Sequence, residues 1–141
     1  MEPIIRTGRL RRADRSGFTL IEIMIVMTII SILVSVAVPM YQKSILRAKE
    51  SLLRNNLFTM RQVIDEYTVD KQKAPQSLDD LVREGYLREV PLDPITGRND
   101  TWQPVMEDAL TAVDQSQPGL WDVHSGSDKT SPLDGTPYAD W

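Results

Sequence analysis

One carboxylate, Glu22, stands near the start of a long apolar stretch of the chain. From Ile23 to Met40 the sequence holds 18 residues without a charged side chain. An unpaired charge in the apolar part of a membrane costs at least about 2.5–3.5 kcal/mol. The position of Glu22 therefore predicts a partner of opposite charge, or else a location among the solvated lipid headgroups.

Two small residues, Ser16 and Gly17, separate this stretch from a basic N-terminal segment. Residues 1–17 carry five arginines against Glu2 and Asp14, a net charge of +3. In an ordinary secretory signal the small residues follow the apolar stretch, so cleavage removes that stretch. Here the order is reversed, and a cut at Gly17 would remove the arginines and keep the apolar segment.

The segment from Phe18 to Met40 is long enough to span a membrane. Its 23 residues would form a helix of about 34 Å, against a hydrocarbon core of about 30 Å. Because the arginines precede it, we expect residues 1–17 in the cytoplasm and residues 41–141 outside.

The rest of the chain is acidic. The net charge of the whole is −4, so residues 18–141 carry −7. An acidic body argues against a nucleic-acid-binding role, which needs a basic face. The absence of cysteine excludes disulfides and thiolate metal sites. With 141 residues, the chain has room for one small domain besides the apolar segment.

Helical periodicity continues beyond Pro39, which predicts one helix from about Phe18 to Asp70, kinked or opened at the proline. An apolar stripe is formed by Leu46, Leu53, Leu57, Met60, Ile64 and Tyr67, with Ile45, Leu52 and Val63 on its flank. Charged residues between them predict a solvated face: Lys43, Arg47, Lys49, Glu50, Arg54, Arg61, Asp65 and Glu66. We expect the stripe to pack on the rest of the domain; a coiled-coil seam is the alternative.

Shorter elements follow. Ser77 is typical of an N-cap and Gly85 of a C-terminal stop, which predicts a second helix over residues 78–84. Beyond Pro91 the frequent prolines and glycines leave two candidate strands, Thr101–Met106 and Leu120–His124. The expected fold class is α+β: a long N-terminal helix, a short second helix, and a small antiparallel sheet with long C-terminal loops.

Catalytic chemistry is not expected. Asp122, His124 and Ser127 have the side chains of a catalytic triad, but they are too close in sequence to assemble one without a sharp turn. His124 is the only histidine, so no second imidazole can join it at a metal. Phosphate-binding and zinc-binding spacings are absent.

The sequence GFTLIE, followed by an uncharged span, resembles the type IV prepilins and pseudopilins. The resemblance implies that a prepilin peptidase cuts between Gly17 and Phe18 and methylates the new amine of Phe18. In a filament, that amine would meet Glu22 of a neighbouring subunit, and each charge would compensate the other.

The C-terminal half narrows this resemblance. The sequences PQSLDDLVREGYLREVPLDPITG and GLWDVHSGSDKTSPLDGTPYADW are similar to the major pseudopilins of type II secretion, general secretion pathway protein G. That family implies a cleaved leader (1–17), a transmembrane and filament-core helix (18–40) and a periplasmic globular domain (41–141). It also implies a homopolymeric filament that drives export of folded proteins across the outer membrane. The implied partners are minor pseudopilins and an inner-membrane assembly platform with its ATPase.

The same family implies a calcium site in the C-terminal loop. Its ligands would be the Ser125 carbonyl and the carboxylates of Asp128, Asp134 and Asp140. Oxygen ligands along a flexible loop suit calcium, which takes six to eight of them. However, residues 129–133 replace a glycine-rich run, and Lys129 adds a cation; the alternative is a solvated acidic loop.

Two other functions stay open. One is a pilin or minor pilin of a type IV pilus, although such pilins often carry a C-terminal cysteine pair that this chain lacks. The other is a membrane protein with one span that never polymerises and carries a small calcium-binding domain. Gly17, Phe18 and Glu22 argue against the latter, because a plain anchor requires none of them.

Overall fold

The computed structural model of the protein describes residues 17–141. The predicted leader, apart from Gly17, lies outside these residues. The chain divides into two compact units, which meet between Met40 and Tyr41. The first unit holds the apolar half of a long helix, and the second holds all remaining elements.

Helix α1 spans Leu20–Lys71 and stays α-helical through Pro39. It begins at Leu20 because Thr19 caps it: the Thr19 Oγ1 accepts the backbone N–H of Glu22 at 3.2 Å. The helix ends one residue beyond the predicted limit, where Gln72 takes a positive φ of 55°. The predicted long helix is thus confirmed.

The apolar half of α1 is covered by nothing within the described residues, since every side chain from 17 to 44 is exposed. Its three hydroxyl groups donate to carbonyl oxygens of their own helix. The bonds are Thr28 to Met24 at 2.7 Å, Ser31 to Met27 at 2.8 Å and Ser35 to Ile32 at 2.7 Å. No side-chain hydroxyl in this segment therefore needs a partner from outside the helix.

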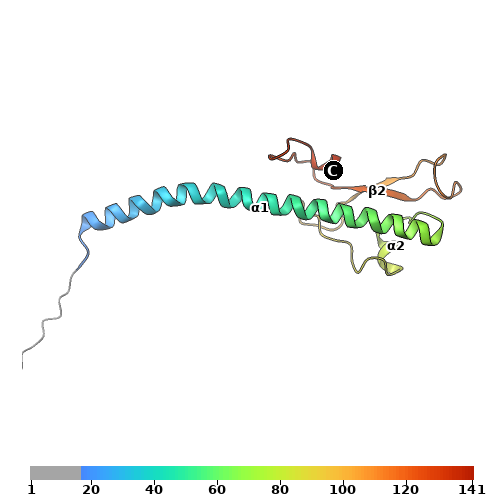
Figure 1. Ribbon diagram of the computed structural model, residues 1–141, viewed down its shortest axis with the longest axis horizontal. Coiled ribbons are helices and arrows are strands. Elements are labelled where there is room, and N and C mark those ends of the chain that lie inside the picture. Colours follow the sequence, from blue (N-terminus) through green and yellow to red (C-terminus); the bar gives the residue numbers. More distant parts are fainter. Residues whose placement is uncertain (1–16) are drawn as a thin grey trace, which may run out of the picture. The chain divides into compact units, whose positions relative to one another are not determined.

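The second half of α1 supplies the core of residues 41–141, where α2 and the sheet both pack along it (Figure 1). The buried stripe of α1 consists of Leu53, Leu57, Met60, Val63, Ile64 and Tyr67. It packs against Leu81, Trp102, Leu120, Val123 and Tyr138 from later parts of the chain. The predicted stripe is confirmed there, but Ile45 and Leu52 are 40% and 50% exposed and do not widen it.

Helix α2 spans Leu78–Arg83, one residue shorter than predicted. Ser77 is its N-cap, with its hydroxyl accepting the N–H of Asp80 at 3.3 Å. Gly85 follows the helix with φ +82°, a conformation that favours glycine. Leu81 is fully buried and fixes α2 against the core.

Two strands, β1 (Gln103–Met106) and β2 (Leu120–His124), form an antiparallel sheet. The β2 limits match the prediction, whereas β1 starts two residues later than expected. Trp102 is drawn into the core instead, and its Nε1 donates to the Pro91 carbonyl at 2.8 Å. A short 3-10 helix, η1, follows at Tyr138–Asp140. These elements confirm the α+β class.

Two residues of the predicted solvated face are wholly or partly buried. Glu50 is only 5% exposed, because its carboxylate accepts hydrogen bonds from the C-terminal loop. Arg61 is half-buried, and its guanidinium donates to Asp122, to a main-chain oxygen of β2 and to the main-chain oxygen of Trp141. Glu50 falls four residues after Leu46 and three before Leu53, so it occupies a position within the apolar stripe itself.

Candidate functional site

The predicted cleavage site lies just before the first turn of α1. Gly17 and Phe18 are outside the helix, and the Phe18 side chain is 77% exposed. A Cβ atom added at Gly17 would meet nothing within 4 Å. Among the described residues, nothing obstructs the peptide bond between Gly17 and Phe18.

Glu22 is the third residue of α1 and lies three residues after the capping threonine, Thr19. Anions are favoured in the first turn because the backbone N–H groups there carry partial positive charge. Within residues 17–141 the Glu22 carboxylate is exposed and forms no ion pair. Its charge is thus available to a group outside the described chain.

Thr19 is a functional residue that the sequence reasoning missed. Threonine followed three residues later by glutamate is the pattern of a capping box, in which the two side chains satisfy each other's backbone N–H groups. The structure shows the threonine half of that exchange. Glu22 therefore has a local role available, helix capping, besides charge pairing with a neighbour.

The four residues of the predicted calcium site have different surroundings in the structure. Ser125 is buried and its hydroxyl donates to Asp93 Oδ2 at 2.5 Å. Asp134 forms an ion pair with Arg54 of α1. Asp128 is exposed, and Asp140 is exposed within η1.

As they lie, these residues do not fit a calcium site. Among residues 17–141 no group of three or more His, Cys, Asp or Glu side chains is placed to hold a metal ion. One carboxylate of the predicted set is neutralised by an arginine, which would have to leave before Asp134 could bind a cation. Calcium binding stays a prediction of the sequence.

What holds the C-terminal loop (residues 125–141) instead is a set of side-chain contacts to α1. Glu50 Oε1 accepts from the Ser131 hydroxyl and from the Tyr138 hydroxyl, both at 2.7 Å. Burial, together with the hydrogen bond to Glu50, raises the pKa of Tyr138 to about 12. Trp141 packs edge-on against Tyr138, with ring centroids 5.0 Å apart.

Arg61 forms a second connection between α1 and the end of the chain. Its Nε donates to Asp122 Oδ1 at 2.6 Å, and its Nη2 donates to the main-chain oxygens of Val123 and Trp141 at 3.1 and 2.9 Å. His124 Nδ1 lies 2.6 Å from the same Trp141 oxygen. These contacts are structural: Arg61 connects α1 to β2 and to Trp141, and His124 connects β2 to Trp141.

The residues of the suspected triad serve separate purposes. His124 Nε2 is 3.6 Å from Asp122 Oδ2. The Ser127 hydroxyl, however, accepts the backbone N–H of Lys129 at 3.2 Å and is buried. The serine is thus a turn-forming group, and the structure gives it no part in a nucleophile–base pair.

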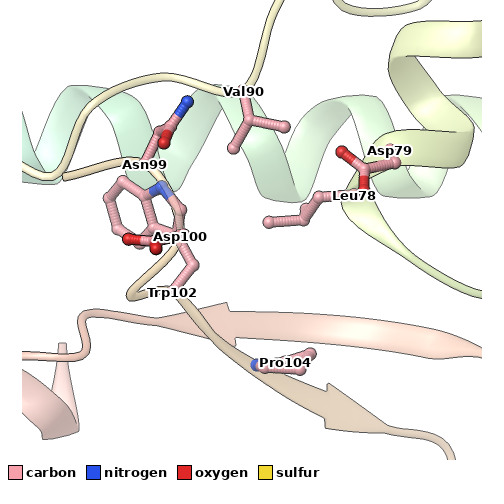
Figure 2. A pocket seen from close by; sticks show the side chains of 7 residues that line it. All are labelled: Leu78, Asp79, Val90, Asn99, Asp100, Trp102 and Pro104. Carbon is pink, nitrogen blue, oxygen red and sulfur yellow. The ribbon is translucent and has the colours of Figure 1, made fainter.

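A pocket of about 270 Å³ lies between the start of α2 and the start of β1 (Figure 2). Its lining residues are Leu78, Asp79, Val90, Asn99, Asp100, Trp102 and Pro104. The Asp100 carboxylate is paired with Arg98, Nε to Oδ1 at 2.7 Å. The lining offers neither a hydroxyl nor an imidazole nucleophile, so the pocket suggests no reaction.

Residues 12–38 match a family model described as the prokaryotic N-terminal methylation motif. The type II secretion system core protein G of Pseudomonas aeruginosa is 32% identical over 101 residues, which cover 60% of this chain and 71% of the relative. The chain belongs to the type II secretion core protein G family. It is therefore a pseudopilin of the type IV pilin-like superfamily.

Other relatives of this pseudopilin agree. The core protein G of Klebsiella michiganensis is 27% identical over 127 residues, covering 79% of this chain and 89% of the relative. The competence protein ComGC of Halalkalibacterium halodurans is 38% identical over 73 residues, covering 52% of this chain and 72% of the relative. No solved structure shows a significant match. Since these relatives are pseudopilins or related filament proteins, the prediction that the chain is not an enzyme is confirmed.

Proposed function

We propose that the pseudopilin is the major structural subunit of a type II secretion pseudopilus and polymerises through the apolar half of α1. The observation that carries this function is the wholly uncovered apolar surface of residues 18–40, headed by a single exposed carboxylate. A membrane covers such a surface in the free subunit, and the corresponding helices of other subunits cover it in a filament.

Processing prepares the subunit for assembly. The prepilin peptidase cuts after Gly17, and the exposed junction supports access to that bond. The new amine of Phe18 is a cation one helical turn before Glu22. Pairing Glu22 with the amine of a neighbouring subunit compensates both charges in an apolar environment, where an unpaired charge is expensive.

The charge distribution supports an orientation. With the arginines of residues 1–17 on the cytoplasmic side, the single span places residues 41–141 in the periplasm. Filament growth from the inner membrane then requires a motor, and this chain offers no nucleotide-binding motif. An assembly platform with its ATPase is the partner that supplies the work, and minor pseudopilins are the partners that initiate the filament.

The test separates charge pairing from helix capping at Glu22. Glu22→Gln keeps a side chain that can complete the capping box but loses the charge, whereas Glu22→Ala loses both. If pairing with the neighbour's amine drives assembly, both variants should insert in the membrane and both should fail to yield pelletable filaments. The measurement is filament recovery by shearing and centrifugation, together with secretion of an extracellular enzyme.

Filaments and secretion at wild-type levels in Glu22→Gln, with loss only in Glu22→Ala, would assign Glu22 to capping. Thr19→Ala is the matched control, because it removes the cap and leaves the charge. Normal assembly in all three variants would contradict a role of this turn in polymerisation.

The ComGC similarity favours one second candidate, a subunit of a competence pilus. The two functions differ in what is lost when the gene is deleted. A type II pseudopilin is needed for release of extracellular proteins, whereas a competence pilin is needed for uptake of DNA. Measuring both in one deletion strain decides between them.

A further inference from the structure

The C-terminal loop is fastened to α1 by a buried carboxylate. Glu50 is only 5% exposed, and its Oε1 accepts from Ser131 and Tyr138, 81 and 88 residues further along the chain. Both hydroxyls belong to the C-terminal loop. One side chain of α1 thus holds this loop at two points.

The Ser131 hydroxyl also organises the loop locally. Its Oγ accepts the backbone N–H groups of Leu133 and Asp134 at 3.2 and 3.1 Å while it donates to Glu50. The backbone N–H of Ser131 donates to the Thr136 carbonyl at 2.8 Å. The turn at residues 131–136 is therefore closed by the same serine that fastens it.

A second buried carboxylate holds the beginning of the loop. Asp93 is fully buried; its Oδ2 accepts from the Ser125 hydroxyl at 2.5 Å, and its Oδ1 accepts the Ile95 N–H at 2.8 Å. The Ser125 Oγ in turn accepts the Ser127 N–H at 3.2 Å. Asp93 and Glu50 thus fix the loop near its start and in its second half.

The surface adds a third contact. Arg54, one turn after Glu50, pairs with Asp134 and lies 4.3 Å above the ring of Trp141. Both side chains of the Arg54–Asp134 ion pair are exposed, so this pair alone contributes little to the stability of the fold. Its consequence is that the carboxylate of Asp134 already has a cation, supplied by α1.

We propose that these protein groups hold residues 125–141 closed without a metal ion, in place of the calcium that the family resemblance implies. Buried side-chain nitrogen and oxygen atoms of residues 17–141 all have a partner, so no buried side chain there is left with an unpaired atom for an ion to bind. Of the predicted ligand residues, Asp134 is paired with Arg54. At Ser125 the carbonyl was the predicted ligand, and the hydroxyl of the same residue donates to Asp93. This proposal does not depend on the filament role.

The experiment uses the full chain in detergent. The three tryptophans, Trp102, Trp121 and Trp141, all lie outside the apolar segment, so their fluorescence reports unfolding of residues 41–141. Thermal melting is measured in chelator and in roughly 5 mM calcium, a concentration above the Kd of weak extracellular sites. We expect the two midpoints to agree within about 1 °C, since a ligand that does not bind cannot stabilise the fold.

Limited proteolysis then tests the fastening residue. Glu50→Ala should raise the rate of cleavage within residues 125–141 at least about tenfold, equally in calcium and chelator, because loss of the carboxylate increases local opening. Asp128→Asn is the matched control and should cleave at the wild-type rate. If Glu50→Ala does not fold, Ser131→Ala and Tyr138→Phe each remove one donor and should give smaller increases.

Two results would overturn the proposal. The first is a calcium-induced rise of several degrees in the wild-type midpoint. The second is a cleavage rate in Glu50→Ala, or in both donor variants, no higher than in Asp128→Asn. The calcium comparison needs only the wild-type chain, so it decides even if every variant fails to fold.

Discussion

Gly126 shows how a single residue can be fixed by the approach of another segment. A Cβ atom at this position would lie 1.7 Å from the Thr101 carbonyl oxygen, a backbone atom that cannot move aside cheaply. We expect Gly126→Ala to lower the free energy of unfolding by about 3 kcal/mol or more, in the range of severe overpacking. Gly135→Ala is the control: it meets no atom within 4 Å but has φ +72°, and should cost about 1–2 kcal/mol. Urea unfolding followed by tryptophan fluorescence measures both, and equal losses would contradict the steric explanation.

Tyr138 predicts a dependence of stability on alkaline pH. Its pKa is raised to about 12 in the folded chain, whereas an unfolded tyrosine has a pKa of about 10. The neutral phenol is thus favoured by folding, and its contribution is complete below pH 10 and disappears as the pH rises through 12. Tyr138→Phe should be less stable by about 1–3 kcal/mol at pH 8. The difference from wild type should shrink between pH 10 and pH 12; a constant difference would exclude this titration.

Residue-scale roles were the hardest to predict from the sequence. The seven-residue gap between Leu46 and Leu53 contains Glu50 at the stripe position, which is the sign of a buried carboxylate. Because Glu50 is charged, it was predicted to lie on the solvated face. Its hydrogen-bond partners are more than 80 residues further along the chain. Helical spacing reports which face a residue occupies, but it does not report which distant hydroxyl satisfies it.

At the scale of elements, local sequence was a better guide. Ser77 caps the start of α2 and Gly85 follows its end, and both act on backbone groups within one turn of the helix. The limits of α2 were therefore predicted to within one residue. The limits of β1 were less predictable, because tertiary packing of Trp102 interrupts the extended pattern before Gln103. The candidate processing site is also a local pattern, since Gly17 to Glu22 is one continuous motif, and it stays a prediction.

The cap of α2 can be tested directly. Ser77→Ala removes the hydroxyl that accepts the Asp80 N–H and should lower the free energy of unfolding by about 0.5–2 kcal/mol. Ser77→Asp keeps an acceptor at the same position and should retain most of the stability. Amide hydrogen exchange of residues 78–83 would show whether the loss is confined to α2. Equal stability of the alanine and aspartate variants would mean that Leu81 packing alone holds this helix.

For the whole molecule, processing is the first event to verify. Mature protein from membranes with active prepilin peptidase should begin at Phe18 and carry one additional methyl group by mass spectrometry. Gly17→Leu should block the cut. Because a Cβ atom at Gly17 would meet nothing within 4 Å, a block would report the fit to the peptidase rather than misfolding. A mature chain that still begins at Met1 would contradict the processing proposal.

The hydroxyls of Thr28, Ser31 and Ser35 bear on what happens when a subunit leaves the membrane. Each is bonded to a carbonyl of its own helix, so none has to exchange a partner when lipid is replaced by neighbouring helices. The apolar half of α1 therefore carries a self-contained set of side-chain hydrogen bonds from one environment to the other. In the proposed assembly, the groups that would change partners are the Phe18 amine and the Glu22 carboxylate, which both lie at the start of the helix.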